Sequence, residues 1–400
     1  MRFMFFFLWI VVGSTLLALI HYYLWIRLVR DPALSTPWRF ILTWTLVAFA
    51  ASLPMAMTIS RWAPFSITQY LVWLPYVWMG TMLYFLFFLG AVDTLRGMAW
   101  VAGKISGQAA LTDGFIQSLM FKRLLAIGVA LIALGLSVTS VCLGARSEQV
   151  DRIEIHLDRL PTSFDGLTIA QISDLHVGLT RAGDWIDDLA DKVNALNADI
   201  IVITGDLMDG PPERLAGELK GLAKLKAPLG VYFVTGNHEY YSGAPEWMPE
   251  LEKLGMRVLR NERVEIRRNG AVFDMAGIDD HNAEGMAEGH GANLDGALKG
   301  RDPDREVILL AHQPRAGLQA AKLDVGLVLS GHTHGGQIWP FSCLVRLQQP
   351  YLKGLHRIPD SRTQVYVNQG TWTWGPPMRL GSHNEISLIT LTSAKPIVEN

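Results

Sequence analysis

The sequence predicts an N-terminal four-helix transmembrane region followed by an α/β domain. Three observations lead to this prediction. Four long apolar runs without an ionised residue lie within residues 1–150. Residues 1–150 carry ten Lys/Arg and four Asp/Glu, against twenty-five and thirty-three in residues 151–400, so the two parts have net charges of +6 and −8. From about Val150, short β-rich runs alternate with polar or helical stretches, which is typical of an α/β domain. We therefore expect a transmembrane region over 1–149 and a catalytic domain over 150–400.

Each apolar run is long enough to cross a bilayer, because about 20 helical residues span the hydrocarbon core. The predicted spans are residues 3–26, 40–59, 70–92 and 124–145. A cleaved signal peptide is the alternative for the first run, but the run is too long, lacks a small-x-small site and is followed by three more. His21 lies inside the first run, where we expect a neutral, hydrogen-bonded ring packed between helices.

The charges of the loops predict the orientation of the spans, because Lys and Arg near span ends are retained in the cytoplasm. The loops after the first and third spans carry seven basic residues: Arg27, Arg30, Arg39, Arg96, Lys104, Lys122 and Arg123. The N-terminus has only Arg2, and the loop after the second span has only Arg61. This bias predicts a multi-pass membrane protein with an extracytoplasmic catalytic domain, although Arg146 and Arg152 argue weakly for the other side.

Composition also excludes several classes of protein. The chain has only two cysteines, so it has neither a disulfide framework nor a thiolate zinc site. Its net charge of −2 gives no basic patch for nucleic acid.

Five apolar runs of the second part end in side chains that can bind metal. They read "LTIAQISDLHVG", "DIIVITGDLMDG", "GVYFVTGNHEY", "EVILLAHQP" and "VGLVLSGHTHGG". In an open α/β sheet, sites are built beyond the carboxyl ends of the strands, so we expect these side chains to converge. The candidate ligands are Asp174, His176, Asp206, Asn237, His312, His332 and His334.

This set of ligands predicts two divalent metal ions. Seven ligands are too many for one open metal site but suit two cations that share a carboxylate. Carboxylate, amide oxygen and imidazole favour Mn, Fe, Zn or Co over calcium, which prefers oxygen alone. Each group also has a structural interpretation, such as a strand-end turn for Asp174 with His176 or an Asx turn for Asp206. Their joint occurrence after five strand-like runs favours the metal site.

The motifs DLH, GDLMD, GNHE, AHQP and GHTH stand in this order in the chain. In this respect residues 150–400 resemble the calcineurin-like metallophosphoesterase superfamily. The segment "GHTHGGQ", followed by the Arg-containing "GTWTWGPPMRLGSHNEISLITL", is similar to membrane-associated phosphodiesterases, and the preceding spans resemble transmembrane metallophosphoesterase-domain proteins. The resemblance implies a sandwich of two mixed β-sheets flanked by helices.

By position, the resemblance also implies the roles of the residues. Asp206 would bridge the two cations, His238 would be the general acid and Asp209 would orient it. The first cation would be held by Asp174, His176, Asp206 and His334, and the second by Asp206, Asn237, His312 and His332. Asp209 has the alternative role of capping a helix that begins near Pro211.

We therefore predict a membrane-anchored phosphoesterase with two metal ions that hydrolyses a phosphodiester or phosphomonoester. A hydroxide bridging the cations would attack, and His238 would protonate the leaving group. The expected substrates include lipid-linked phosphoesters and other envelope components, and Arg379 is a candidate for binding the substrate phosphate, with bracing of its own loop as the alternative. Two other hypotheses are a catalytically silent metal-binding scaffold, and a membrane sensor or transporter regulated by the soluble domain.

Overall fold

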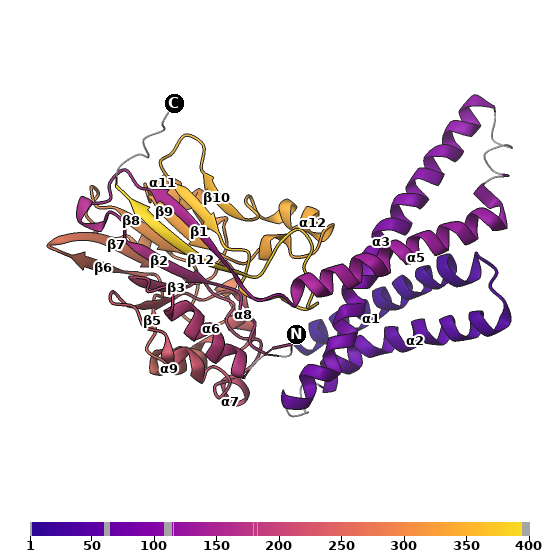
Figure 1. The fold of residues 1–400 in the computed structure, drawn as a ribbon, viewed down its shortest axis with the longest axis horizontal. Coiled ribbons are helices and arrows are strands. Elements are labelled where there is room, and N and C mark those ends of the chain that lie inside the picture. Colours follow the sequence, from indigo (N-terminus) through magenta and orange to yellow (C-terminus); the bar gives the residue numbers. More distant parts are fainter. Residues whose placement is uncertain are drawn as a thin grey trace. The chain divides into compact units, whose positions relative to one another are not determined.

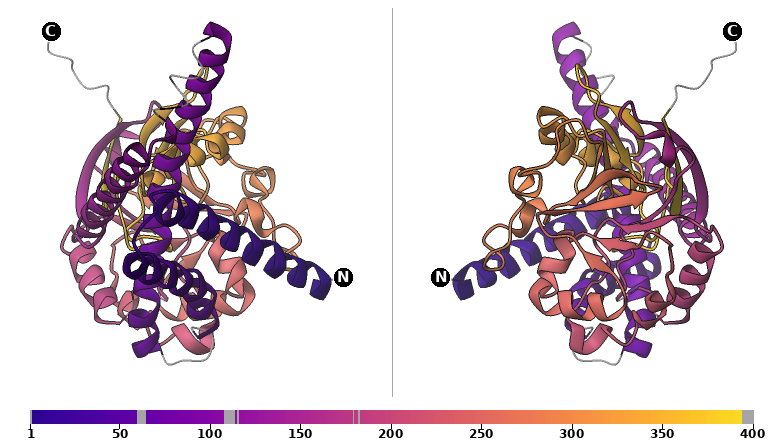
Figure 2. Two further views of the ribbon diagram at one scale, coloured as in Figure 1. Left: turned by 90° about the vertical axis from the view of Figure 1, so that its right-hand side faces the viewer. Right: turned by 90° about the vertical axis from the view of Figure 1, so that its left-hand side faces the viewer.

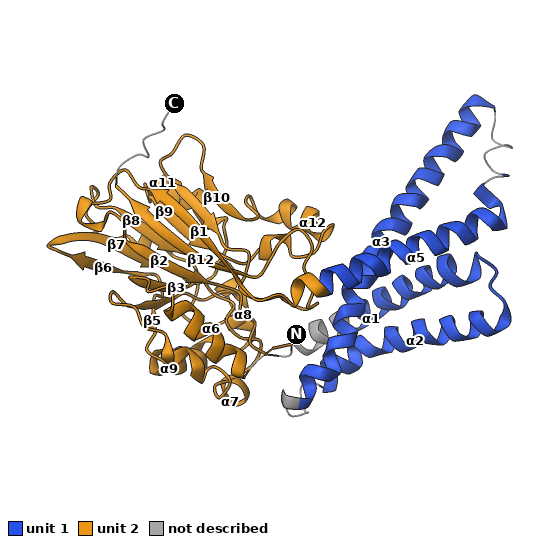
Figure 3. Cartoon of the chain, viewed as in Figure 1, with its two compact units in different colours: residues 1–141 blue, residues 142–400 orange. Residues whose placement is uncertain are grey.

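The computed structural model describes residues 2–59, 65–107, 114, 116–178, 180–181 and 183–393. The chain divides into two compact units, Met1–Val141 and Cys142–Asn400 (Figure 3). We describe each unit separately.

Unit 1 consists of long apolar helices. Within the described residues, four helices are long and apolar enough to cross a membrane, so the predicted four-helix region is confirmed. Their bounds are α1 (Arg2–Trp25), continued by a π-helical turn η1 (Ile26–Arg30), then α2 (Thr36–Ile59), α3 (Phe65–Ser106) and α5 (Leu119–Gly144). Arg61, which entered the charge count of the loops, lies outside the described residues.

The third span differs from its expected extent. We expected a loop over residues 94–121, but α3 continues as one helix of 42 residues to Ser106. No proline follows Val92 in this segment, so nothing forces the helix to end there. Asp93, just beyond the predicted span, forms ion pairs with Arg27 at 2.7 Å and Arg96 at 3.4 Å. The C-terminal part of α3 diverges from α1 and α2 (Figures 1 and 2).

His21 is a buried ring of α1 with both nitrogens in hydrogen bonds. Its Nδ1 lies 2.8 Å from the carbonyl oxygen of Leu17, and Trp78 Nε1 donates to His21 Nε2 at 3.0 Å. The ring therefore offers no free nitrogen to a proton path, which speaks against the transporter hypothesis.

Unit 2 contains two mixed six-stranded sheets. The first has the order β1-β12-β2-β3-β4-β5, and the second β10-β11-β9-β8-β7-β6. The strands of the first sheet are β1 (Gln149–His156), β12 (Glu385–Thr392), β2 (Thr168–Ile172), β3 (Ile200–Ile203), β4 (Val231–Phe233) and β5 (Arg257–Val258). Those of the second are β10 (Gly354–Arg357), β11 (Gln364–Val367), β9 (Leu327–Ser330), β8 (Val307–Leu310), β7 (Ala271–Gly277) and β6 (Glu262–Arg268).

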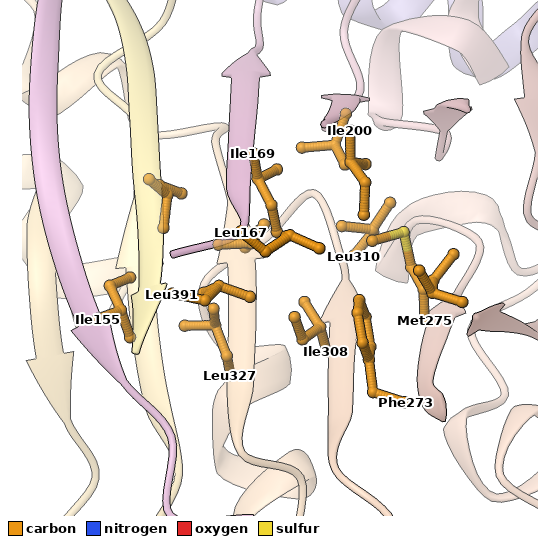
Figure 4. Close-up of a cluster of buried hydrophobic side chains, with 14 of the residues drawn as sticks. Ile155, Leu167, Ile169, Ile200, Phe273, Met275, Ile308, Leu310, Leu327 and Leu391 are labelled. Atoms are coloured by element: carbon orange, nitrogen blue, oxygen red, sulfur yellow. The ribbon is translucent and has the colours of Figure 1, made fainter. Parts of the chain in front are cut away.

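The two sheets pack face to face around one apolar core (Figure 4). Because side chains alternate along a strand, Ile308 and Leu310 of β8 enter this core, whereas Val307 and Leu309 enter a second cluster on the outer face of their sheet. That outer cluster includes Leu294 and Ala320, which come from two helices. The predicted sandwich flanked by helices is therefore confirmed.

Several helices of unit 2 have one apolar side that is buried, as α10 and α11 have against the outer face of the second sheet. On α6, for example, Trp185, Ile186, Leu189 and Val193 are buried at helical spacing. The helices are α6 (Asp184–Asn194), α7 (Pro212–Leu215), α8 (Asn237–Tyr241), α9 (Ala244–Lys253), α10 (Leu294–Ala297), α11 (Ala316–Lys322) and α12 (Phe341–Gln348). Short 3-10 turns are η2 (Thr162–Phe164), η3 (Lys220–Lys224), η4 (His281–Ala283) and η5 (His334–Gly336).

The sheet topology determines where the site lies. Strands β2, β3 and β4 run parallel in the first sheet, and β8 and β9 run parallel in the second. Their carboxyl ends therefore lie at common sheet edges, and every predicted ligand follows one of these five strands.

Candidate metal centre

The first group of predicted ligands gathers around two facing imidazoles. His176 Nε2 lies 3.1 Å from His334 Nε2, and His334 Nε2 lies 3.4 Å from Asp174 Oδ1. One ligand atom from each of these three residues lies within 4.8 Å of the other two, although His176 and His334 are 158 residues apart in the chain. All three side chains are buried. This spacing suits a single cation held by three ligands.

A second group forms around Asp206. Its Oδ2 lies 3.1 Å from His312 Nε2, and His332 Nδ1 lies 3.1 Å from the same His312 nitrogen. The same Oδ2 is also 3.8 Å from His176 Nε2 in the first group. Asp206 thus stands between the two groups, which is the position that a shared carboxylate requires.

Asn237 supplies an independent test of the site. It is the first residue of α8 and is buried, with 7% of its surface exposed. Its Oδ1 is a buried atom without a hydrogen-bond partner in the described part of the chain. A buried amide oxygen without a partner is costly, whereas a cation would satisfy it. The oxygen therefore fits a metal ligand.

The outward-facing nitrogens of three histidines have hydrogen-bond acceptors. His312 Nδ1 contacts the carbonyl oxygen of Thr204 at 2.7 Å, and His334 Nδ1 contacts that of Trp372 at 3.1 Å. His176 Nδ1 contacts Asp209 Oδ1 at 3.0 Å. With a proton on each Nδ1, the Nε2 lone pairs point into the centre, which is the usual orientation of metal-binding histidines.

The pKa values of the two buried carboxylates are shifted in opposite directions. Burial raises the pKa of Asp174, and the negative charge of Asp206 adds to this effect. Burial acts in the same direction on Asp206, but His312 and His238 hold its pKa well below the usual range. Two buried carboxylates so close together favour a bound cation, which would stabilise the ionised form of both.

Asp209 and His238 form a dyad beside the ligands. His238 Nδ1 lies 2.6 Å from Asp209 Oδ1, the same oxygen that accepts from His176. Burial lowers the pKa of His238, but the charge of Asp206 and the hydrogen bond to Asp209 raise it to about 9. The ring is therefore held in its charged form near neutral pH, as a general acid requires.

Two exposed aromatic rings border His238. The ring centroids of Tyr241 and Trp374 lie 5.2 Å and 5.7 Å from that of His238, both nearly edge-on. Both side chains are exposed at their outer edges. Trp374 therefore lies at the surface beside the site.

Glu239 connects the loops that carry two of the ligands. Its buried carboxylate accepts hydrogen bonds from the backbone N–H groups of Gly236, Asp206 and Leu207 at 2.5–2.9 Å. These bonds join the loop of Asp206 to the start of α8. Gly236 lies very close to the loop of Asp206. A Cβ on Gly236 would stand 2.2 Å from Asp206 Oδ1.

Backbone strain is concentrated at the ligands, a feature that sequence reasoning missed. Five non-glycine residues of the centre have positive φ angles: Asp174, His176, Asp206, His332 and His334. Such angles are uncommon outside glycine and cluster at functional sites. Residue type alone gave no signal for them.

Arg379 does not have the position that substrate binding requires. Its side chain is fully buried, and its N–H groups donate to the carbonyl oxygens of His334, Gln369, Gly370 and Trp372 and to Asn384 Oδ1. Its guanidinium is thereby used within the protein, so the predicted contact with a substrate phosphate is replaced by the alternative, bracing of its own loop. Burial in this case lowers the pKa of Arg379 to about 9.

Comparison with known proteins agrees with this geometry. A family model for the calcineurin-like phosphoesterase matches residues 167–336. A transmembrane protein with metallophosphoesterase domain from Bos taurus is 38% identical over 333 residues, which cover 80% of this chain and 73% of the relative. Its Danio rerio counterpart is 36% identical over 320 residues, covering 78% and 71%. An uncharacterised metallophosphoesterase of Helicobacter pylori is 36% identical over 272 residues, covering 68% and 71%.

The similarity extends beyond the catalytic unit. Unit 2 comprises residues 142–400, so an alignment of 333 residues must include part of the helical unit. The chain belongs to the calcineurin-like metallophosphoesterase family and is similar to its transmembrane members.

Proposed function

We propose that this membrane protein hydrolyses phosphodiesters or phosphomonoesters at a centre of two divalent metal ions. The observation that carries the proposal is the arrangement around Asp206, whose carboxylate stands between two histidine groups beside the unpartnered oxygen of Asn237. Two such cations, when bound, supply an acidic water as nucleophile and neutralise the charge of the phosphoryl group.

The residues of the chain would then have three tasks. Asp174, Asp206 and the histidines around them hold the cations, with Thr204, Trp372 and Asp209 fixing the orientation of the rings. His238 donates its proton to the leaving oxygen, since its imidazolium is stabilised by Asp206 and Asp209. Glu239 holds the loops of Asp206 and Asn237 in register.

We further propose that the catalytic domain is extracytoplasmic. Support comes from the basic residues near the span ends on one side of the predicted arrangement, such as Arg27 in η1 and Arg123 in α5. On that side of the membrane, phosphoesters of lipids and other envelope components are the substrates within reach. The names of the relatives specify a metallophosphoesterase and no substrate.

The proposal is tested with the full-length protein purified in detergent. After chelation and reloading with Mn²⁺, we expect hydrolysis of bis-p-nitrophenyl phosphate that depends on the metal. Asp206→Asn should lower the rate at least about 100-fold, because the shared ligand contributes more than the outer hydrogen-bond partners of a metal site. The matched control is Asp191→Asn, an exposed aspartate of α6, which should keep the parent rate.

The scaffold hypothesis predicts a different result. A silent scaffold would bind Mn²⁺, as measured by calorimetry, without metal-dependent turnover of phosphodiesters or phosphomonoesters. Equal rates in Asp206→Asn and the parent protein would also contradict the assignment.

A further inference from the structure

Helix α12 (Phe341–Gln348) has an apolar side that nothing in the described part of the chain covers. Phe341, Leu344 and Leu347 are exposed to 39%, 54% and 82%. At about 100° per residue they occupy an arc of about 120° on the helix. We refer to these three residues as the apolar ridge. Every residue of α12 itself is at least partly exposed, so the helix is attached to unit 2 without being part of its core (Figure 1).

The apolar ridge is connected to the rim of the metal centre. Gln337 Nε2 donates to the carbonyl oxygen of Trp374 at 2.9 Å, and the backbone N–H of Trp374 donates to Gln337 Oε1 at 2.9 Å. Trp374 in turn borders His238, and α12 begins four residues after Gln337. A surface that contacts the ridge therefore lies close to Trp374 and His238 at the edge of the metal centre.

The charge around the ridge is opposite to that of the domain. Residues 331–359 contain no Asp or Glu but carry Arg346, Lys353 and Arg357, within a region, residues 151–400, whose net charge is −8. Arg346 belongs to α12 and is exposed. Arg346 lies about 160° around the helix from the centre of the ridge, so α12 has an apolar side and a basic side, which matches the boundary between acyl chains and anionic headgroups.

We propose that the apolar ridge docks on the surface of the bilayer, with Arg346 and Lys353 against anionic headgroups. The bilayer is the occupant because the same chain carries four candidate spans, and only residues 145–148 separate the last of them from β1. Three apolar side chains on an eight-residue helix would bind a membrane weakly from solution. A tether makes the contact intramolecular and greatly raises the effective concentration of the membrane.

The test uses the native Cys343, which is an exposed cysteine of α12. In a Cys142→Ser background, the full-length protein is labelled at Cys343 with bimane and reconstituted in phosphatidylcholine vesicles containing about one-fifth phosphatidylglycerol. Lipids carrying a nitroxide near the top of the acyl chain serve as quenchers. We expect about a twofold or greater loss of fluorescence, because the apolar face of an interfacial helix lies about 5–10 Å within the headgroup boundary.

The matched control probe is Lys253→Cys in a Cys142→Ser/Cys343→Ser background. Lys253 is 68% exposed at the end of α9, on the other sheet, and its label should keep its fluorescence. Equal quenching at both positions, or none at Cys343, would overturn the proposal. Formation of a Cys343–Cys343 disulfide by the unlabelled Cys142→Ser protein, with no quenching by lipid after labelling, would also overturn it and would assign the ridge to a second copy of the chain.

Substitutions in the ridge test which forces hold it. Leu344→Ser combined with Leu347→Ser should abolish at least half of the quenching, whereas Leu318→Ser, an equally exposed leucine of α11, should not change it. Arg346→Glu should lower the quenching only in vesicles that contain phosphatidylglycerol. Unchanged quenching in the double variant, with an unchanged midpoint of thermal unfolding, would refute the role of the ridge.

Discussion

His238 and Arg379 show how far residue type determines a role. Both are basic side chains in segments that resemble sequence motifs of phosphoesterases. His238 lies beside the ligands, with Asp209 at 2.6 Å and an exposed side bordered by Tyr241 and Trp374. Arg379 is fully buried against backbone carbonyls. The motif spacing predicted that His238 lies near the ligands. The burial of Arg379 could not be predicted, because it depends on loops whose sequence has no regular hydrophobic pattern.

If His238 is the general acid, its removal should affect poor leaving groups most. With His238→Ala, we expect the kcat for an alkyl phosphodiester to fall about 10²–10⁴-fold, because its alkoxide must be protonated as it leaves. The kcat for a p-nitrophenyl ester should fall far less, since p-nitrophenolate leaves without a proton. The ratio of the two rates is the measurement, and His356→Ala, a half-buried histidine of β10, is the control.

The same residue predicts a pH dependence. Asp206 and Asp209 raise the pKa of His238 to about 9, so the acid form is present below that pH and is lost above it. Hydrolysis of the alkyl ester should therefore decline as the pH rises through about 9, while hydrolysis of the p-nitrophenyl ester continues. An equal decline for both esters, or an equal loss of both in His238→Ala, would assign His238 to binding instead.

At the level of elements, the site is built from the loops that follow β2, β3, β4, β8 and β9. The sequence predicted this because each ligand follows a short apolar run. It did not predict the positive φ angles of Asp174 or His332, which arise where the backbone turns sharply inside a packed edge. It also missed the extension of α3, because Asp93 and Arg96 interrupt the apolar run and the residues after them have only a weak helical period.

Close packing between these loops makes Gly331 sensitive to the smallest substitution. A Cβ at Gly331 would stand 2.0 Å from Ser173 Oγ and 2.3 Å from Asp174 Oδ2. We expect Gly331→Ala to lower the affinity for Mn²⁺ at least about tenfold and the free energy of unfolding by about 1–3 kcal/mol.

Calorimetric titration and denaturant unfolding measure these two effects. Gly217→Ala is the control, since a Cβ at Gly217 would meet nothing within 4 Å. Parent-like Mn²⁺ affinity in Gly331→Ala would show that the loop after β9 adjusts freely, against the packing described above.

For the whole molecule, composition predicted both parts correctly because membrane spans and soluble α/β domains have different sequence patterns. Unit 1 is apolar with basic loops, whereas unit 2 is acidic and alternates between buried strands and helices. What composition could not supply is the chemical nature of the substrate, because the predicted ligands are metal-binding side chains and carry no information about the groups attached to a phosphate. Side chains outside the motifs, such as Trp374 beside His238, were not predicted to lie at the site.

The side of the membrane can be tested directly. We expect Lys220→Cys, an exposed position in unit 2, to react with a membrane-impermeant maleimide on intact cells, in a Cys142→Ser/Cys343→Ser background. Arg30→Cys at the end of η1 should react only after permeabilisation, because basic residues near span ends are retained in the cytoplasm. The reverse pattern would place the catalytic domain in the cytoplasm and make cytoplasmic phosphoesters its substrates.

The hydrogen-bond acceptors that orient the candidate metal-binding histidines are of two kinds, main-chain and side-chain oxygens. The difference determines which mutations can remove them during evolution. Main-chain oxygens of Thr204 and Trp372 orient His312 and His334, and no point mutation can delete a main-chain oxygen. His176 depends instead on the side chain of Asp209, which it shares with His238. A homologue that kept metal binding but lost the proposed catalysis would therefore be expected to lack His238 and to keep Asp209. Loss of Asp209 would remove the hydrogen bonds of both His238 and the candidate ligand His176.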